Sequence, residues 1–198
     1  ASLKDDLLGT YEKLKGSGAY SPDAASTGRR ALRNLCLGYL GGAGMSALAY
    51  GQFGRADNMT DSMASLAVLA NLDCAERQPA LDAFYARWKN DSLVVDKWLS
   101  VQASSRLPGT LSNVARLLKH PAFDLKVPNK VYALIRAFGA NHVRFHDAAG
   151  GGYAFLADQV IALDALNPQV GARMARAFDR WKKFDQGRKA HARAQLER

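Results

Sequence analysis

The sequence lacks the long apolar segments that membrane proteins need. Its 198 residues contain no run of about 18 consecutive apolar residues, the length that a transmembrane helix requires. The first residues, Ala1-Ser-Leu-Lys-Asp-Asp, contain neither an apolar core nor a cleavage-like site, so we expect no signal peptide. These absences predict a soluble globular segment that has no membrane as its partner.

The chain is also poor in cysteine. Its two cysteines, Cys36 and Cys74, lie too far apart for a Cys-x-x-Cys motif, and each has apolar neighbours. Such cysteines are typical of small buried side chains in the reducing cytoplasm. We therefore expect two reduced, buried thiols in a cytoplasmic protein, with neither a disulfide nor a metal bound through sulfur.

Apolar residues make up 48% of the chain and recur almost everywhere at helical spacing. A chain of this length can bury roughly 70% of its unfolded surface, which suffices for one sizeable core or a short helical array. Proline and glycine clusters separate the apolar faces, and no segment alternates convincingly as a strand does. The pattern predicts an all-α chain of about nine or ten short helices, arranged as a single armadillo- or HEAT-like α-solenoid domain over residues 1–198. The expected helices lie within residues 3–14, 25–39, 59–70, 81–88, 94–101, 111–118, 131–138, 153–163 and 170–183.

Two glycine-rich segments invite a nucleotide-binding interpretation. Residues Gly42–Ala47 fit the Gly-x-Gly-x-x-Ala dinucleotide pattern, with Asp61 roughly at the expected distance. That pattern has meaning only after a strand in a βαβ unit, whereas here it follows an expected helix. The second segment, Gly150–Gly152, lacks the Lys-Ser or Lys-Thr of a phosphate loop. We interpret the first segment as a turn between helices and assign no phosphate loop to the second.

Two histidines have the spacing of a metal-binding helix. His142 and His146 are four residues apart and precede Asp147, which on a helix would place two imidazoles on one face. The Glu of a His-Glu-x-x-His motif is missing between them, and the flanking Gly139 and Gly150 indicate a loop. We favour an ordinary connector whose polar groups bond the backbone over a zinc site.

The positive charge is concentrated near the end of the chain. The formal net charge is +9, and residues 173–198 hold nine Lys or Arg against three acids. Arg173, Arg176, Arg180 and Lys183 are expected on one side of a long final helix. Such a stripe could follow a phosphate backbone, but it carries no interleaved aromatic residues for base stacking. We favour a solvated face, or a basic wall that faces a partner domain or a peptide carboxylate, over nucleic acid.

The segment from Phe145 to Arg173 resembles the C-terminal helical domain of bacterial aminopeptidase N, the gluzincin alanyl aminopeptidase family. It contains the stretches Gly-Gly-Gly-Tyr and Asn-Pro-Gln-Val-Gly-Ala-Arg. The sequence departs from the family pattern at Val127, where Asn is common, and at Tyr132, where Arg is common, so no family role is carried over to position 132. Further segments resemble the same family in the same order, namely Tyr20–Leu37, Asn58–Asp61, Val95–Trp98 and His120–Val131.

The resemblance implies a curved helical stack within a parent enzyme that uses zinc to remove N-terminal residues from peptides. The family's zinc site has a His-Glu-x-x-His helix, a further Glu downstream and a Gly-Ala-Met-Glu-Asn strand, and none of these occurs in the 198 residues. We therefore expect this chain to hold no catalytic residue, metal ligand or cofactor and to be inactive alone. Its implied partners are the catalytic domain of the same polypeptide and the peptide substrate.

Two polar residues are the candidates for contact with that substrate. In the stretch from Asn167 to Arg173, Pro168 suits a first helical turn, and Gln169 and Arg173 are then four residues apart on one face. The resemblance implies that this helix approaches the zinc domain and lines a closed chamber near the far end of a peptide. Arg binds a carboxylate through two parallel hydrogen bonds, and Gln can meet a peptide amide. The alternative is a surface pair without a ligand.

A second reading of the whole chain belongs to another functional class. An autonomous α-solenoid scaffold could bind a protein or a nucleic acid through its concave or basic face. The reading frame upstream of Ala1 discriminates between the two readings, because a His-Glu-x-x-His helix there would support the enzyme domain.

Overall fold

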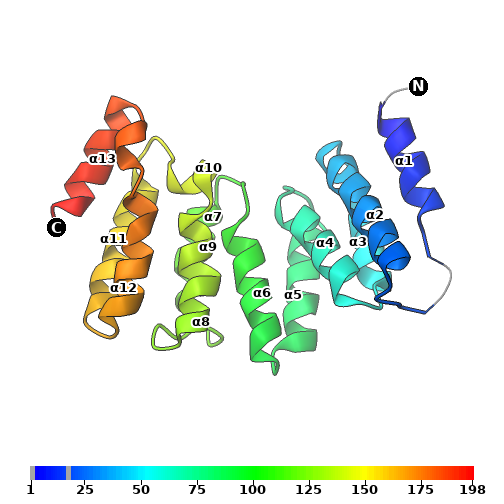
Figure 1. Cartoon of the computed structure of the whole chain (residues 1–198), viewed down its shortest axis with the longest axis horizontal. Helices are drawn as coiled ribbons and strands as arrows, with labels where there is room; N and C mark the ends of the chain where they lie inside the picture. Colours follow the sequence, from blue (N-terminus) through cyan, green and yellow to red (C-terminus); the bar gives the residue numbers. More distant parts are fainter. Residues whose placement is uncertain (1–2, 17–18) are drawn as a thin grey trace. The chain divides into compact units, whose positions relative to one another are not determined.

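The computed structural model describes residues 3–16 and 19–198, which form helices joined by short links, with no strand among them (Figure 1). The predicted all-α class is therefore confirmed for the described part of the chain. The chain divides into two compact units, residues 1–86 and 87–198, and each is described by itself. The single domain over 1–198 stays a prediction.

The first unit contains four complete helices and most of a fifth. Its core includes Leu37, Leu40, Leu66 and Leu69, all fully shielded from solvent. Both helices expected near its start are present, although their bounds shift by a few residues, and in the second of them Leu32 and Tyr39 are exposed while Leu37 and Leu40 are buried. The helices are α1 (Leu3–Lys13), α2 (Ala24–Gly42), α3 (Ser46–Arg55), α4 (Met59–Ala70) and α5 (Arg77–Trp88).

Helix α3 was not expected from the spacing of large apolar residues. Its buried residues are Ala49 and Gln52, so a small and a polar side chain face the interior. Gln52 is tolerated there because its amide is bonded: Oε1 accepts from Tyr11 Oη at 2.9 Å, and Nε2 donates to Asn34 Oδ1 at 2.7 Å. Buried polar groups need such partners. Residues 43–45 form the turn between α2 and α3, so the Gly42–Ala47 segment spans a helix-to-helix turn, as interpreted from the sequence.

The Asn58–Asp61 segment begins α4 with a reciprocal cap. The Asn58 side chain accepts from Asp61 N at 2.9 Å, and its Nδ2 donates to Asp61 Oδ2 at 3.0 Å. The same carboxylate accepts from Arg33 Nη2 and from Asn34 Nδ2, both at 2.8 Å. A single buried aspartate thus satisfies the helix start and connects α4 to α2.

The second unit continues the helical pattern with shorter and less regular pieces. Helices α8, η1 and α9 follow one another without a break, with a π-helical segment at η1. The elements are α6 (Ser92–Ala103), α7 (Thr110–Leu117), α8 (Pro128–Val131), η1 (Tyr132–Arg136), α9 (Ala137–Gly139), α10 (His142–Phe145), α11 (Gly151–Asp164), α12 (Pro168–Ala175), η2 (Arg176–Phe178), η3 (Trp181–Lys183) and α13 (Gln186–Leu196).

The described residues contain more helices than the nine or ten expected. When α8, η1 and α9 are taken as one helix and the short 3₁₀ turns η2 and η3 are set aside, there are twelve. The additions are α3, α10 and α13. None of these helices is both long and apolar enough to cross a membrane within the described part of the chain.

The glycine run at residues 150–152 sets the start of α11. Gly150 has φ 75°, a left-handed conformation that other residues adopt at a cost. A Cβ on Gly152 would lie 2.3 Å from the carbonyl oxygen of Phe145. The run therefore lets the backbone of α11 approach α10, and Phe145 packs edge-on against Tyr153 with ring centroids 5.2 Å apart.

The prediction of a long final helix was wrong. Helix α12 ends at Ala175, two 3₁₀ turns follow, and α13 begins afresh at Gln186 after the N-cap Asp185. The break allows the chain to turn so that Phe184 stacks on His146 with ring centroids 3.9 Å apart. Arg173, Arg176, Arg180 and Lys183 consequently do not share one helix face.

The two cysteines are free thiols. Cys36 is 2% exposed, as predicted. Cys74 is only partly buried, so the prediction that both are buried was wrong for Cys74. It lies in the link before α5, where burial and a hydrogen bond to Glu76 raise the pKa of its thiol.

Candidate functional site around Arg173

Helix α12 presents the predicted polar pair on its outer face. Asn167 caps the helix, its side chain accepting from Val170 N at 3.2 Å, and Pro168 occupies the first turn. Val170 is buried, with Met174 one turn further along, against α11, which lies beside α12 (Figure 1). Gln169 and Arg173 are exposed as a result.

Arg173 is held by a residue 41 positions earlier in the chain. Its Nη1 donates to Tyr132 Oη at 3.0 Å. Tyr132 opens the π-helical segment η1, and π-turns inside α-helices are frequent at functional sites. The guanidinium of Arg136 lies 5.9 Å from the centroid of the Tyr132 ring. Tyr132 therefore connects two arginines that come from different helices.

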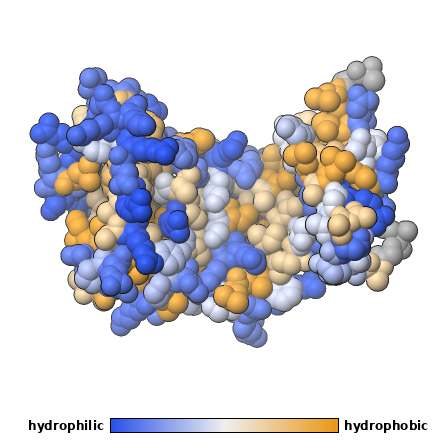
Figure 2. Space-filling model, viewed as in Figure 1, coloured by the Kyte–Doolittle hydropathy of each residue, from blue (hydrophilic) through white to orange (hydrophobic). Residues whose placement is uncertain are grey.

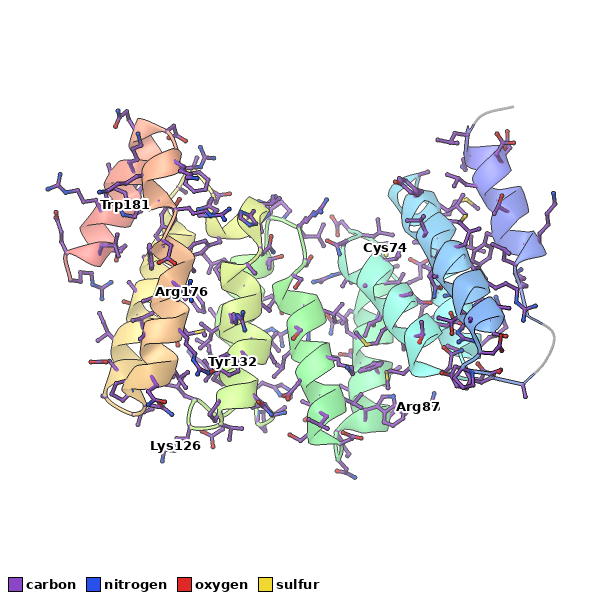
Figure 3. The ribbon with its side chains drawn as sticks, viewed as in Figure 1. Cys74, Arg87, Lys126, Tyr132, Arg176 and Trp181 are labelled. Carbon is purple, nitrogen blue, oxygen red and sulfur yellow. The ribbon has the colours of Figure 1, made fainter. Side chains whose placement is uncertain are left out.

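An open cavity of about 600 Å³ lies between these helices. Its polar lining comes from Tyr132, Asp179 and three arginines, and Ile135, Leu156 and Met174 are among its apolar residues. Figure 3 labels Tyr132 on the α8–α9 helix and Arg176 just beyond α12. The arginines are Arg136, Arg173 and Arg176.

The charge around the cavity is positive. Asp179 is the one carboxylate among its lining residues, and it accepts from Arg176 Nε at 3.3 Å. Both partners of that pair are largely exposed, with 79% and 56% of their side-chain surface accessible, so the pair is weak. Hydrophilic side chains also gather over α12 and α13 on the face seen in Figure 2. Arg136 and Arg173 remain available to a carboxylate, which an arginine binds through two hydrogen bonds.

Only one of the two predicted site residues lines the cavity. Arg173 lines the cavity, but Gln169, one turn earlier, is not among the lining residues. Sequence reasoning assigned no role to Tyr132 or Arg136. Their spacing of four residues on an expected helix was the available signal, but nothing in it pointed to Arg173.

His142 in α10 and His146, the residue that follows this helix, lie close together. Their ring centroids are 5.6 Å apart, and the described residues contain no group of three or more His, Cys, Asp or Glu that could hold a metal ion. His146 is buried, and its Nδ1 lies 2.9 Å from Tyr153 Oη. Burial, and then the positive charges of His142 and Arg188, lower the pKa of His146 to about 4.

The prediction of an ordinary connector at residues 142–146 was wrong in one respect. His142–Phe145 forms a short helix, α10, and the side chain of Asn141 caps it by accepting from Arg144 N. Asn141 is itself anchored, because its Nδ2 donates to the carbonyl oxygen of Ser105 at 2.7 Å. The cap stabilises one helical turn at a place where the flanking glycines had led us to predict a loop.

Comparison with known proteins places the whole chain in one family. The family model described as "Domain of unknown function (DUF3458_C) ARM repeats" matches residues 1–198. Aminopeptidase N of Caulobacter vibrioides is 39% identical over 99% of this chain and 23% of its own length. Aminopeptidase N of Haemophilus influenzae is 35% identical, and that of Escherichia coli 37% identical, over 100% and 98% of this chain. The chain spans about 23% of the length of these curated relatives.

A solved structure shows the same fold. The crystal structure of Legionella pneumophila aminopeptidase A in complex with aspartic acid matches with a TM-score of 0.89 and 33% identity. The match covers 98% of this chain and 24% of that one. The resemblance to the C-terminal part of aminopeptidase N is thereby confirmed, and so is the armadillo-type repeat class.

Proposed function

The chain belongs to the DUF3458_C family of ARM-repeat domains, and we propose that it acts as the non-catalytic C-terminal domain of a zinc-dependent aminopeptidase N. The curated relatives that support this proposal carry that name and extend well beyond the matched segment. The catalytic metal and its ligands would lie in the remainder of the polypeptide. No step of hydrolysis is assigned to this chain, because its described residues offer no ligand set for a metal.

The domain encloses the active-site chamber and limits entry to short, unfolded peptides. Its partners are the catalytic domain of the same polypeptide and the peptide substrate, in the cytoplasm. The observation that carries this proposal is the orientation of Arg173 by Tyr132 at the edge of a positively charged cavity. A guanidinium held in advance loses less conformational entropy when it binds a carboxylate. Arg173 accordingly binds the distal end of the peptide, and Gln169 meets an amide of the same substrate.

The experiment compares the 198-residue chain with the polypeptide extended to its natural start. Both are purified and assayed for bound metal and for hydrolysis of an alanine amide. The extended protein is expected to retain about one zinc after dialysis and to hydrolyse the substrate, whereas the chain alone does neither. An extended protein without zinc and without peptidase activity would overturn the proposal.

An autonomous scaffold for a protein or nucleic acid is the second candidate. It would use a concave or a basic face, and the interruption of the helix after Ala175 divides the basic stripe that the second of these faces needs. An upstream reading frame without a His-Glu-x-x-His helix would restore this candidate.

A further inference from the structure

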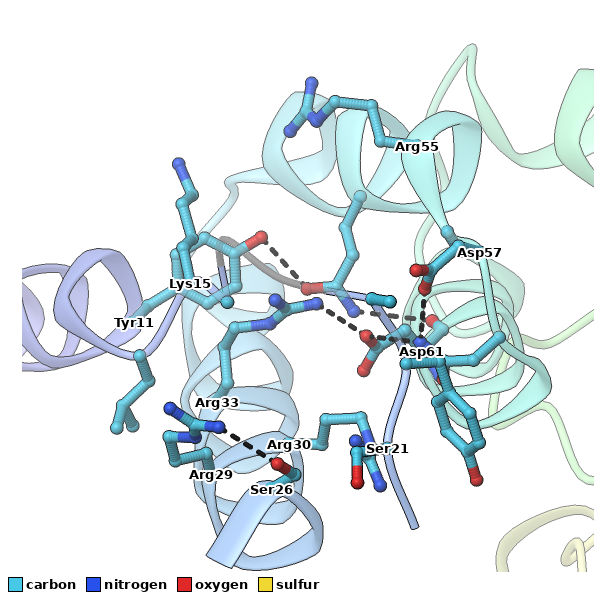
Figure 4. Close-up of a pocket in the computed structure, with 17 residues that line it drawn as sticks. Tyr11, Lys15, Ser21, Ser26, Arg29, Arg30, Arg33, Arg55, Asp57 and Asp61 are labelled. Atoms are coloured by element: carbon cyan, nitrogen blue, oxygen red, sulfur yellow. Dashed lines mark hydrogen bonds and ion pairs between the residues drawn. The ribbon is translucent and has the colours of Figure 1, made fainter. Parts of the chain in front are cut away.

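A second cavity lies entirely within the first unit, far along the sequence from Arg173. Its volume is about 500 Å³, within the range of cavities that hold small molecules. Helices α1 to α4, residues 14–16 and residues 19–21 all contribute to its wall (Figure 4). It is independent of the proposed peptidase role, because none of its residues belongs to the cavity around Arg173.

Cationic side chains dominate this wall. Five of them face two carboxylates, those of Asp57 and Asp61, so the lining has a clear excess of positive charge. An enclosed site of one charge sign attracts ions of the other sign. The five are Lys15, Arg29, Arg30, Arg33 and Arg55.

Most of these charges are not neutralised by a neighbouring carboxylate. Arg33 is paired with Asp61 at 2.8 Å, and Lys15 with Glu12 at 2.5 Å. Arg29 Nη2 instead donates to Ser26 Oγ at 2.9 Å, and Arg30 Nη2 to Thr27 Oγ1 at 3.1 Å. A hydroxyl acceptor satisfies a hydrogen bond but leaves the positive charge uncompensated.

Two donors at this wall lack an acceptor. The Nε atoms of Arg30 and Arg33 are shielded from solvent and have no hydrogen-bond partner among the described residues. A shielded donor without a partner costs about 1–3 kcal/mol. The feature is unusual, since buried polar groups are nearly always bonded.

Aromatic rings hold the guanidinium groups in place. Arg30 Cζ lies 4.7 Å from the centroid of the Tyr20 ring, and Arg33 Cζ lies 5.8 Å from that of Tyr11. Tyr11 is fixed in turn by its bond to Gln52. The donors are thus oriented before any ligand arrives, which favours a planar or branched oxyanion.

We propose that this cavity binds a small phosphate-bearing anion, with Arg29 and Arg30 as its principal ligands. A di- or triphosphate group carries several negative charges, as the cluster requires, and its many oxygens match the forked donors of arginine. The remaining volume accommodates an organic group beside Tyr20. A single carboxylate would compensate only one of Arg29, Arg30 and Arg55, the three cationic side chains of this wall that form no ion pair among the described residues.

Titration calorimetry on the full-length polypeptide tests the proposal, with inorganic pyrophosphate as the probe. Measurable binding is expected, and the affinity should fall as the NaCl concentration is raised. In both Arg29→Gln and Arg30→Gln the affinity should fall roughly tenfold or more. Arg29 is exposed on α2, where its side chain donates a hydrogen bond to Ser26 one turn earlier, so its replacement should leave the fold intact. Arg29→Lys should restore part of the affinity. The matched control is Arg180→Gln, an equal charge change outside both cavities.

Three results would overturn the proposal. The first is the absence of pyrophosphate binding at millimolar concentration, and the second is binding that Arg180→Gln weakens as much as Arg29→Gln does. The third is preferential binding of an acetylated triglutamate amide, which would identify an acidic peptide as the occupant. None of these results would change the outcome of the peptidase assays, so the anion-binding proposal and the proposed function are tested independently.

Discussion

The guanidinium of Arg33 lies 2.8 Å from the carboxylate of Asp61, and both side chains are largely buried, with 14% and 7% of their surface exposed. The pair connects α2 with the first turn of α4, and Asn34 and Asn58 complete the hydrogen bonds of the carboxylate. Because the acceptor is shared by three side chains, its removal affects all of them.

We predict that Asp61→Ala lowers the free energy of unfolding by about 3–5 kcal/mol, since it leaves Arg33 as an uncompensated charge in a shielded place. Urea unfolding monitored by circular dichroism measures the change. Asp179→Ala is the control, because it breaks the exposed pair with Arg176, and exposed pairs contribute at most about 1 kcal/mol. Equal losses in the two variants would contradict the prediction.

Arg173→Ala in the full-length enzyme is expected to weaken the binding of tri- and tetrapeptides roughly ten- to a hundredfold. The variant removes a charge-assisted hydrogen bond worth about 1.5–3 kcal/mol. Single-residue chromogenic amides lack the distal end and should react normally. Steady-state kinetics on both substrate types gives the comparison.

Two further variants test whether the loss of peptide affinity arises at the Arg173 site. Tyr132→Phe deletes only the hydroxyl that accepts from Arg173, so it should produce a smaller loss on the same peptides. Gln169→Ala should also reduce affinity for the same peptides, because it removes the proposed contact with a peptide amide. Parallel losses on peptides and on amides would instead indicate that α12 is displaced.

We predict that stability falls as the pH decreases from about 6.5 to about 4, because the pKa of His146 is lowered from 6.5 to about 4 by burial and nearby positive charge. Between these values the unfolded chain binds more protons than the folded chain, so protons favour unfolding. The contribution is complete above pH 6.5 and lost below about pH 4. Its size is on the order of 1–3 kcal/mol.

Urea unfolding at pH 7, 6, 5 and 4 checks this dependence when the wild-type protein is compared with two histidine variants. His146→Gln should flatten the slope between pH 6.5 and 5, whereas His142→Gln, at an exposed neighbouring position, should retain most of it. A wild-type slope that survives in His146→Gln would assign the effect to other groups.

Gly152→Ala is expected to destabilise the protein by more than about 2 kcal/mol, because the new Cβ would lie 2.3 Å from the backbone oxygen of Phe145, and overpacking of this kind forces the backbone to move. Gly38→Ala is the matched control. It lies inside α2 with no atom within 4 Å of the new Cβ, so it should stabilise by up to about 1 kcal/mol. Thermal unfolding of both variants measures the contrast.

Part of the candidate site followed from local rules. The sequence Asn167-Pro168 predicts a helix start, and the spacing of Val170 and Met174 predicts which face is buried. Gln169 and Arg173 were therefore expected on the outer face, where both lie. The contact between Arg173 and Tyr132 could not be predicted, because it joins residues 41 positions apart.

The amino-acid sequence by itself determined the all-α class, most helix positions and the caps at Asn58 and Asn167, because these depend on interactions between residues a few positions apart. Only the tertiary structure decided that Gln52 is buried, that the chain breaks after Ala175, and that two groups of arginines line separate cavities. Each of these depends on long-range partners. A buried amide is stable only beside Tyr11 and Asn34, and the chain turns after α12 to place Phe184 on His146.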